Sequence, residues 1–270
     1  AYYDQAGIRV RYIHQRINHN IFQDPAALME NIERVTVHAL NKLQQEDSPE
    51  AYRRTLTCIP AKTGKPYAID SDGNFWRTYP FIERARTYDI LETAAQAEEA
   101  ARAFGEFQKL GADLPGEPLK ETIPNFHNTK ARFQALKDAV AADACGRAAD
   151  VQKEIDWFLS REKDANKVVD LLDAGEIPIR VTHNDTKLNN VMLDDVSGEG
   201  VCVIDLDTTM PGSAIDDFGG MIRTATSPAP EDEVDTSKIT MRIEMFESLV
   251  RGYLKSANSF LTDKERENLA

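Results

Sequence analysis

The chain has 270 residues, with 32 Lys and Arg against 45 Asp and Glu, which gives a net charge of −13 at pH 7. This acidic balance argues against a nucleic-acid partner, because contacts with the phosphate backbone require clustered Lys and Arg. The hydrophobic content of 41% and the charged content of 29% are typical of a globular protein with one large core or two smaller ones.

The N-terminal part predicts a strand followed by a helix. Apolar and charged residues alternate over 8–17, which is typical of a strand with one buried face. Asp24 is a candidate N-cap, and Pro25 suits the first position of a helix that runs to about Leu43. The apolar residues of this helix recur at helical spacing and form its expected buried stripe. These residues are Leu28, Ile32, Val35, Ala39 and Leu40.

Three further strands are predicted before residue 83. Two are short and cover 55–60 and 67–69. Asp72-Gly73 is a hairpin turn signal, and the strand after it runs from Phe75 to Ile82. The residues expected on one face of that strand are Phe75, Arg77, Tyr79 and Phe81.

The remainder of the chain is rich in predicted helices. A polar loop over 121–129 precedes one of them, and Asn128 or Thr129 can cap it. A Pro- and acid-rich loop is expected over 227–233. The amphipathic or Ala-rich segments read as helices cover 93–110, 132–144, 150–172 and 239–256.

The most informative stretch covers 179–207. Short apolar runs at 179–181, 191–193 and 201–204 are typical of buried strands. The polar loop between the first two reads HNDTKLNN over 183–190, and the third run ends on Asp205-Leu206-Asp207. A solvated turn could explain the loop alone, but it does not explain the acidic strand end that follows.

Phosphoryl transfer needs a carboxylate near the attacking hydroxyl and oxygen ligands for Mg²⁺. The His-x-Asp pattern, with Asn five residues after the Asp and a later strand ending in Asp, has the spacing of a protein-kinase catalytic loop. Asp185 would then orient the substrate hydroxyl, Asn190 and Asp205 would hold Mg²⁺, and Lys187 could reach the transferred phosphate. His183 is expected to support the loop, because no second His or Cys lies nearby at zinc-ligand spacing.

The segments HNDTKLNN and VIDLDTTMPGSAIDDFGG resemble the aminoglycoside-phosphotransferase-like small-molecule kinases. Among these, the chain is most similar to the N-acetylhexosamine 1-kinases, from about Tyr12 to about Arg223. The resemblance implies a two-lobed, protein-kinase-like α+β fold, with a nucleotide-binding lobe over 1–85 and a helical lobe over 86–270. It also implies ATP as phosphate donor, Mg²⁺, and transfer to the anomeric hydroxyl of GlcNAc or GalNAc.

On the nucleotide side, the resemblance places Gln15 where the family has a phosphate-binding Lys, so Arg16, the metal or Lys187 would have to compensate. Glu33 would brace the phosphate-binding strand, although an ordinary surface Glu fits equally well. Adenine would bond to backbone groups near Phe81 and Ile82, while Pro80 cannot donate.

On the acceptor side, His127 and Arg132 could bond sugar hydroxyls, with loop packing as the alternative. Asp217 would brace the catalytic loop, with His183 as its candidate partner. Asp207 is expected to share a strand face with Asp205 by alternation, as a second metal contact or a sugar contact.

Two other functions remain open. One is phosphorylation of an aminoglycoside or another small hydroxyl substrate by the same chemistry. The other is an inactive nucleotide-binding module, suggested by Gln15 and by ends that look truncated. The resemblance implies a strand and a glycine-rich loop before Ala1 and further helix after Ala270. Cys58, Cys145 and Cys202 are widely spaced, which favours a reducing, cytoplasmic location, and no apolar run approaches the length of a membrane span.

Overall fold

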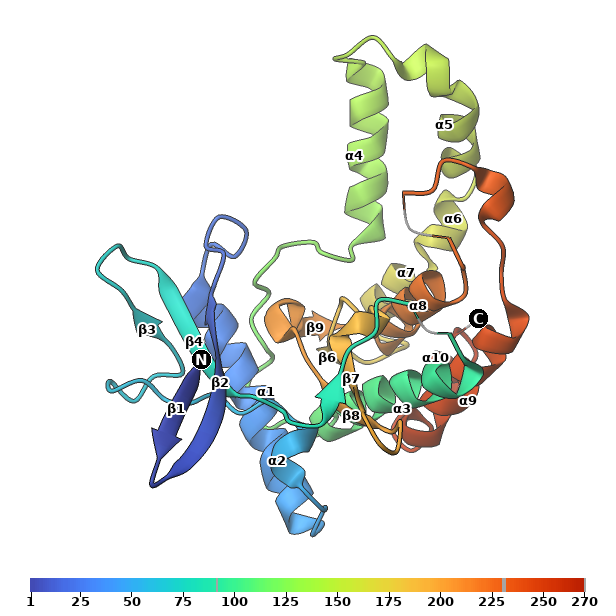
Figure 1. Ribbon diagram of the computed structural model, residues 1–270. Coiled ribbons are helices and arrows are strands. Elements are labelled where there is room, and N and C mark those ends of the chain that lie inside the picture. Colours follow the sequence, from blue (N-terminus) through green and yellow to red (C-terminus); the bar gives the residue numbers. More distant parts are fainter. Residues whose placement is uncertain (91, 230–231, 270) are drawn as a thin grey trace.

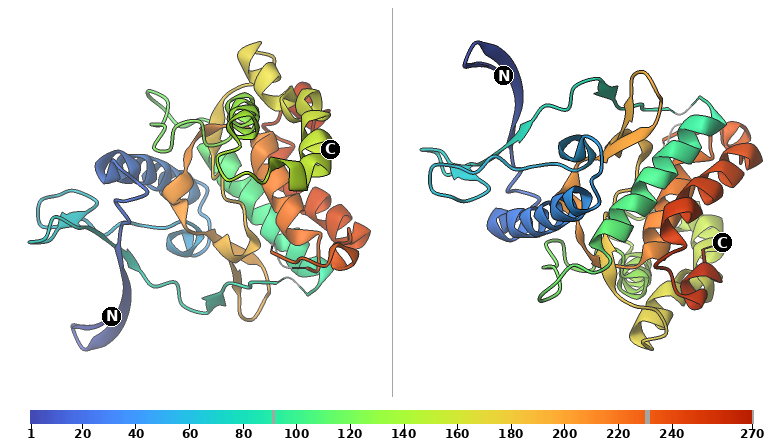
Figure 2. Two further views of the ribbon diagram at one scale, coloured as in Figure 1. Left: turned by 90° about the horizontal axis from the view of Figure 1, so that it is seen from above. Right: turned by 90° about the horizontal axis from the view of Figure 1, so that it is seen from below.

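A computed structural model describes residues 1–90, 92–229 and 232–269. It has the expected two-lobed, kinase-like α+β architecture, with a small sheet lobe beside a mostly helical lobe (Figure 1). The same two parts lie side by side in the perpendicular views of Figure 2. Residues 230 and 231, within the acid-rich loop predicted over 227–233, lie outside the described residues. None of the described helices is long and apolar enough to cross a membrane.

The small lobe is built on an antiparallel sheet with strand order β1-β2-β4-β3. Helix α1 (Pro25–Gln45) packs beside it, and Asp24 caps this helix by accepting a hydrogen bond from the N–H of Ala27 at 2.9 Å. The predicted turn at Asp72-Gly73 joins β3 to β4. The strands are β1 (Tyr2–Gln5), β2 (Ile8–Arg16), β3 (Ala68–Ile69) and β4 (Phe75–Pro80).

Two predictions for this lobe were wrong in part. The segment 55–60 is not a strand; it follows the short helix α2 (Ala51–Arg54) as extended chain. Its bond to β4 from the N–H of Ile59 to the carbonyl of Thr78 does not extend into a ladder. The strand predicted to reach Ile82 ends at Pro80, which lacks the N–H needed to continue pairing.

The helical lobe is organised around α3 (Ala94–Gly111) and α9 (Ile243–Ala257), which lie side by side (Figure 2). A capping box between Thr93 and Gln96 starts α3, close to the predicted boundary. The backbones approach closely, because a Cβ at Gly252 would lie 2.0 Å from the carbonyl oxygen of Glu98. Helix α9 begins at Ile243, later than the predicted start at residue 239.

Small sheets carry the loop of greatest interest. Strands β5, β7 and β8 pair in that order, and β6 pairs with β9. Helix α8 (Ala214–Ala225) follows β9 and is capped by Ser213. These strands and the short 3-10 helices between them are β5 (Ala85–Arg86), β6 (Arg180–Thr182), η2 (Leu188–Asn190), β7 (Val191–Asp194), β8 (Gly200–Val203), η3 (Leu206–Thr208) and β9 (Met210–Gly212).

Helix α4 (Thr129–Ala142) projects from the body with α5 beside it (Figure 1). Asn128 is its N-cap, as one of the two predicted alternatives. The single helix predicted over 150–172 was wrong, because the chain breaks near Ser160, whose hydroxyl donates to the carbonyl of Trp157 at 2.8 Å. The remaining elements are η1 (Ala148–Val151), α5 (Gln152–Leu159), α6 (Glu162–Ala165), α7 (Lys167–Asp173), η4 (Thr236–Lys238) and α10 (Asp263–Arg266).

Candidate active site

A buried carboxylate holds the backbone of the loop over 183–190 in place. Asp217 on α8 is 2% exposed and accepts hydrogen bonds from the backbone N–H groups of His183 and Asn184 at 2.8 and 2.7 Å. The amide of Gln108 on α3 donates to the same carboxylate at 2.7 Å. Three donors on one carboxylate fix the backbone of the loop against α8 and α3. The contact with His183 is made by its backbone and not by its imidazole.

His183 is itself fully buried and ties the loop to the end of β8. Its Nε2 lies 2.9 Å from the carbonyl oxygen of Ile204, so this nitrogen must carry the proton. Its Nδ1 accepts from the N–H of Asp185 at 3.3 Å, which leaves the ring neutral. The ring also makes edge contacts with Phe104 and Phe107. This residue holds the loop in place and is not open to substrate.

Asp185 and Asn190 lie together in this loop, Asp185 half-buried and Asn190 buried. The side-chain amide of Asn190 donates to the backbone carbonyl of Asp185 at 2.9 Å and lies 3.5 Å from its carboxylate. The ammonium of Lys187 is 3.4 Å from the same carboxylate. Asp185 is half-buried, whereas Lys187 remains 45% exposed and can move toward a bound group.

Asp205 follows β8 and adopts a left-handed backbone conformation with φ of 58°. Its carboxylate faces an interlobe cavity. Desolvation in the cleft and then the charge of Asp207 raise its pKa, and Asp185 adds to this effect. Three carboxylates near one another create a local negative field that a cation would relieve.

The expectation for Asp207 was wrong in its geometry. Strand β8 ends at Val203, so Asp205 and Asp207 are not alternate residues of one strand. Asp207 lies in η3 and forms an ion pair with Arg77 of β4, which is 5% exposed. Its carboxylate therefore links the small lobe to the segment after β8.

The donor set at this point suits a hard divalent cation. The Nδ2 of Asn190 is used by Asp185, so its Oδ1 remains available beside the carboxylate of Asp205. Mg²⁺ is usually bound by one or two carboxylates, with phosphate oxygens and water completing the octahedron. Within the described ranges, no three His, Cys, Asp or Glu side chains converge as a metal cage. A cation held by Asn190 and Asp205 would thus need further oxygen ligands from phosphates or water. It would neutralise charge on the bound phosphates.

A cavity of about 560 Å³ lies between the lobes. Its small-lobe wall includes Gln15, Phe81 and Ile82, and its opposite wall includes Asn190 and Asp205. Most residues that the sequence predicts to bind nucleotide or metal therefore line this interlobe cavity. Glu33 and Asp207 do not line it. Glu33 is half-buried and, among the residues described, forms no ion pair.

The backbone at the end of β4 is only partly available to an adenine. The N–H of Phe81 already donates to the carbonyl of Arg11 at 3.0 Å, so an adenine would have to use other backbone groups near Phe81 and Ile82. The guanidinium of Arg11 also covers the Phe81 ring, with its carbon 3.6 Å from the ring centroid. In the part of the chain that the structure describes, the N–H of Ile82 has no partner.

A second cavity, of about 380 Å³, lies on the other side of Asp185. His127, Lys187 and Asp216 also line it. The imidazole of His127 lies 3.1 Å from the carbonyl oxygen of Asn184. Arg132 does not line this cavity, because its guanidinium donates to the carbonyl of Phe126, with the Nε contact at 3.1 Å.

A model of the phosphotransferase enzyme family matches residues 61–249, which include the loop over 183–190, Asp205 and α8. The chain belongs to this family. The fold is similar to that of an aminoglycoside phosphotransferase from Alicyclobacillus acidocaldarius, with a TM-score of 0.57 at 14% identity over 96% of this chain and 74% of that one. It is also similar to aminoglycoside phosphotransferase APH(3'')-Id from Streptomyces rimosus, solved with ADP and streptomycin, with a TM-score of 0.53 at 12% identity over 99% and 89% of the two chains.

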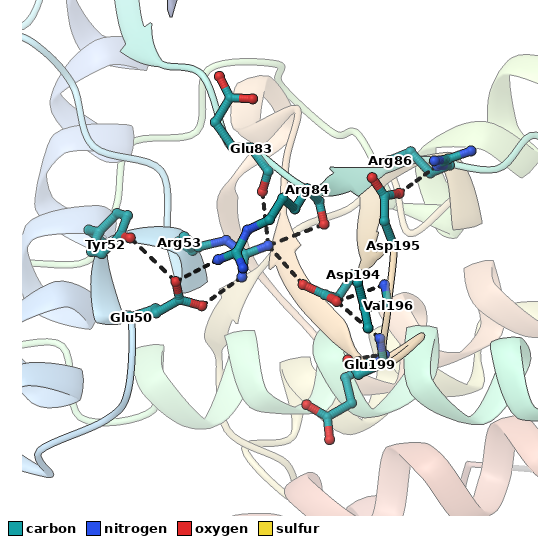
Figure 3. A network of polar contacts seen from close by, with 11 residues as sticks. Glu50, Tyr52, Arg53, Glu83, Arg84, Arg86, Asp194, Asp195, Val196 and Glu199 are labelled. Carbon is teal, nitrogen blue, oxygen red and sulfur yellow. Dashed lines mark hydrogen bonds and ion pairs between the residues drawn. The ribbon is translucent and has the colours of Figure 1, made fainter. Parts of the chain in front are cut away.

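In this phosphotransferase, a buried arginine fixes the segment between the lobes (Figure 3). Arg53 of α2 is 7% exposed and donates to the carbonyl of Glu83 and to the carboxylate of Asp194, both at 2.9 Å. It also pairs with Glu50 at 2.7 Å. Because Asp194 ends β7, Arg53 sets the position of the linker relative to the hairpin that begins beside Asn190. No sequence pattern had pointed to this residue.

Asp216 gives the phosphotransferase a testable pH dependence. Burial, reinforced by Asp217 and opposed by His127, raises its pKa to about 6. The folded state therefore holds this proton more tightly than the unfolded chain, where Asp titrates near 4. The resulting stabilisation is complete below about pH 4 and is lost as the pH rises through about 6.

We expect Asp216→Asn to remove this dependence. The variant should be more stable than the parent by about 1–2 kcal/mol at pH 7.5 and nearly equal to it at about pH 3.5. Urea unfolding at the two pH values measures the difference, with Asp164→Asn on α6 as a control. An equal shift at both pH values would contradict the assigned titration.

Proposed function

We propose that the protein is an ATP- and Mg²⁺-dependent kinase that phosphorylates a hydroxyl of a small molecule. The observation that carries this proposal is the hydrogen bond that joins Asp185, in the acceptor-side cavity, to Asn190, in the interlobe cavity. The carboxylate of Asp185 lines the acceptor-side cavity, while Asn190, bonded to its backbone, lines the interlobe cavity with Asp205. A donor phosphate and an acceptor hydroxyl could therefore meet at this carboxylate.

In this proposal Asp185 orients the acceptor hydroxyl and receives its proton. Asn190 and Asp205 hold Mg²⁺, which neutralises charge on the phosphates, and Lys187 contacts the transferred group. The transition state of phosphoryl transfer needs positioning and charge stabilisation more than covalent chemistry. The division into a nucleotide lobe over 1–85 and an acceptor lobe over 86–270 is part of the same proposal.

The proposed acceptor is an N-acetylhexosamine phosphorylated at its anomeric hydroxyl, on the strength of the resemblance in HNDTKLNN and the segment through Gly220. His127 is the proposed sugar contact. Arg132 is not proposed as one, because its guanidinium donates to the carbonyl of Phe126 in its own loop. The three cysteines are free thiols, which supports a reducing compartment such as the cytoplasm.

A cationic acceptor is the second candidate, favoured by one feature of the acceptor-side cavity. Asp216 and Asp185 both line it, so an amino group would meet two carboxylates there. The Streptomyces rimosus enzyme was solved in complex with ADP and streptomycin, which carries groups of this charge class. Acidic walls attract a cationic substrate more than a neutral sugar.

ADP release measured with a panel of acceptors tests both candidates. We expect release with GlcNAc or GalNAc, and phosphorus NMR of the product should show the anomeric phosphate. Release only with kanamycin or streptomycin would replace the sugar proposal with the cationic one. Binding of ATP without ADP release across the panel would favour an inactive nucleotide-binding module.

A further inference from the structure

A buried cationic side chain lines the interlobe cavity, and the catalytic-loop pattern does not account for it. A nucleotide carries several negative charges, and the metal-site carboxylate of Asp205 adds another. Gln15 occupies the wall at the end of β2 and is neutral. Among the described residues that line the cavity, the cationic side chains are Arg77 and Arg86.

These two arginines differ in their exposure and in their partners. Arg86 is 63% exposed and pairs with Asp195 at 2.5 Å (Figure 3). Arg77 is 5% exposed, and the register of β2 with β4 places it opposite Gln15. A charge enclosed in this way acts through a lower effective dielectric and is less screened by salt.

The guanidinium of Arg77 is only partly used. Its Nε donates to the side-chain oxygen of Gln15 at 3.0 Å, and its Nη1 pairs with Asp207. Its Nη2 has no partner among residues 1–90, 92–229 and 232–269. Gln15 and Asp207 therefore hold the group in one orientation and leave donors free toward the cavity.

Arg16 does not offer an equivalent charge. Side chains alternate along a strand, so Arg16 points to the face of β2 opposite Gln15. Lys187 lines the acceptor-side cavity and lies beside Asp185. It can reach a transferred phosphate, but it does not line the interlobe cavity.

We propose that Arg77, oriented by Gln15 and Asp207, is the residue that binds the nucleotide phosphates in the interlobe cavity. This inference rests on the proposed function, because it assumes that the cavity holds a nucleotide. It moves the phosphate-binding charge from β2 to the neighbouring strand β4. Gln15 then has a function of its own: its side-chain oxygen accepts from Arg77 and orients the guanidinium.

The test is calorimetric binding of ADP and adenosine in EDTA, so that no metal contributes. The informative variant is Arg77→Gln combined with Asp207→Asn, because it leaves no buried carboxylate unpaired. We expect its ADP affinity to fall about 10- to 100-fold, the range for losing a hydrogen bond to a charged group. Adenosine affinity should change less than about twofold, since adenosine lacks the phosphates that the charge would bind.

Two further variants separate charge from structure. Asp207→Asn alone keeps an oxygen that can accept from the guanidinium and orient it, and it removes a negative charge, so ADP should bind at least as tightly as in the parent. Gln15→Lys in the doubly substituted background returns a positive charge next to position 77 and should restore much of the ADP affinity. Thermal unfolding of each variant confirms that it is folded before binding is measured.

Unchanged ADP affinity in the folded double variant would overturn the proposal, as would an equal loss of adenosine and ADP binding. These results are distinct from failure of the proposed function. A parent protein that binds ADP but phosphorylates no acceptor would refute the kinase function while leaving the role of Arg77 intact. A parent protein that binds no nucleotide would refute both.

Discussion

Asp185→Asn is expected to lower kcat by roughly 10²-fold or more, the range for a lost general base. The substitution keeps the shape of the side chain and removes its charge and basicity. The backbone carbonyl that holds Asn190 is unaffected, so the metal and nucleotide sites should stay formed. The KM for ATP should therefore change little, and the loss should fall on the chemical step.

Steady-state ADP release under saturating acceptor measures this effect. Asp138→Asn, at an exposed carboxylate on α4 that accepts from Gln134, is the matched control and should retain full turnover. A near-normal kcat in Asp185→Asn would remove this residue from the proposed role. A large rise in the KM for ATP with kcat unchanged would instead make it part of the nucleotide site.

Arg53→Ala is expected to destabilise the protein by about 3 kcal/mol, the range for breaking a buried ion pair from one side. The substitution leaves the half-buried carboxylate of Asp194 and the carbonyl of Glu83 without their donor. Both lie in the network of Figure 3, at the junction between the lobes. Urea unfolding monitored by tryptophan fluorescence measures the change.

Arg84→Ala provides a control within the same network. Arg84 also pairs with Glu50, at 2.8 Å, but its side chain is 63% exposed. An exposed pair of this kind contributes less than about 1 kcal/mol. If the two substitutions cost the same, the burial of Arg53 would not be what makes it important.

The elements that carry the site were predictable because local signals agreed with one another. The apolar runs that became β7 and β8 are short and bounded by turn residues, and Asp24-Pro25 marked the start of α1. The convergence of Asp185, Asn190 and Asp205 was expected from their spacing. Asn190 and Asp205 line the interlobe cavity, whereas Asp185, which is bonded to Asn190, lines the acceptor-side cavity, so their joint role stays a prediction.

The errors arose where local patterns do not determine contacts between distant segments. Alternation failed beyond Val203 because Asp205 takes a left-handed conformation, and Asp207 therefore faces a partner 130 residues earlier in the sequence. The strand pattern had placed Arg77 on the same face as Tyr79. A charged arginine on a face expected to be buried was the sequence signal that could have identified Arg77 as a site residue. For Arg132 the contact of its guanidinium with the carbonyl of Phe126 favours the alternative of loop packing, which the sequence had left open.

The close packing of α3 against α9 also constrains the order of folding. The contact at Gly252 joins a helix that ends at residue 111 to one that begins at residue 243. While the ribosome is still translating the intervening segment, the face of α3 that packs against α9 in the folded protein lacks this partner. The helical lobe can complete its core only after α9 emerges, so chains interrupted before that point should depend on chaperones to avoid aggregation.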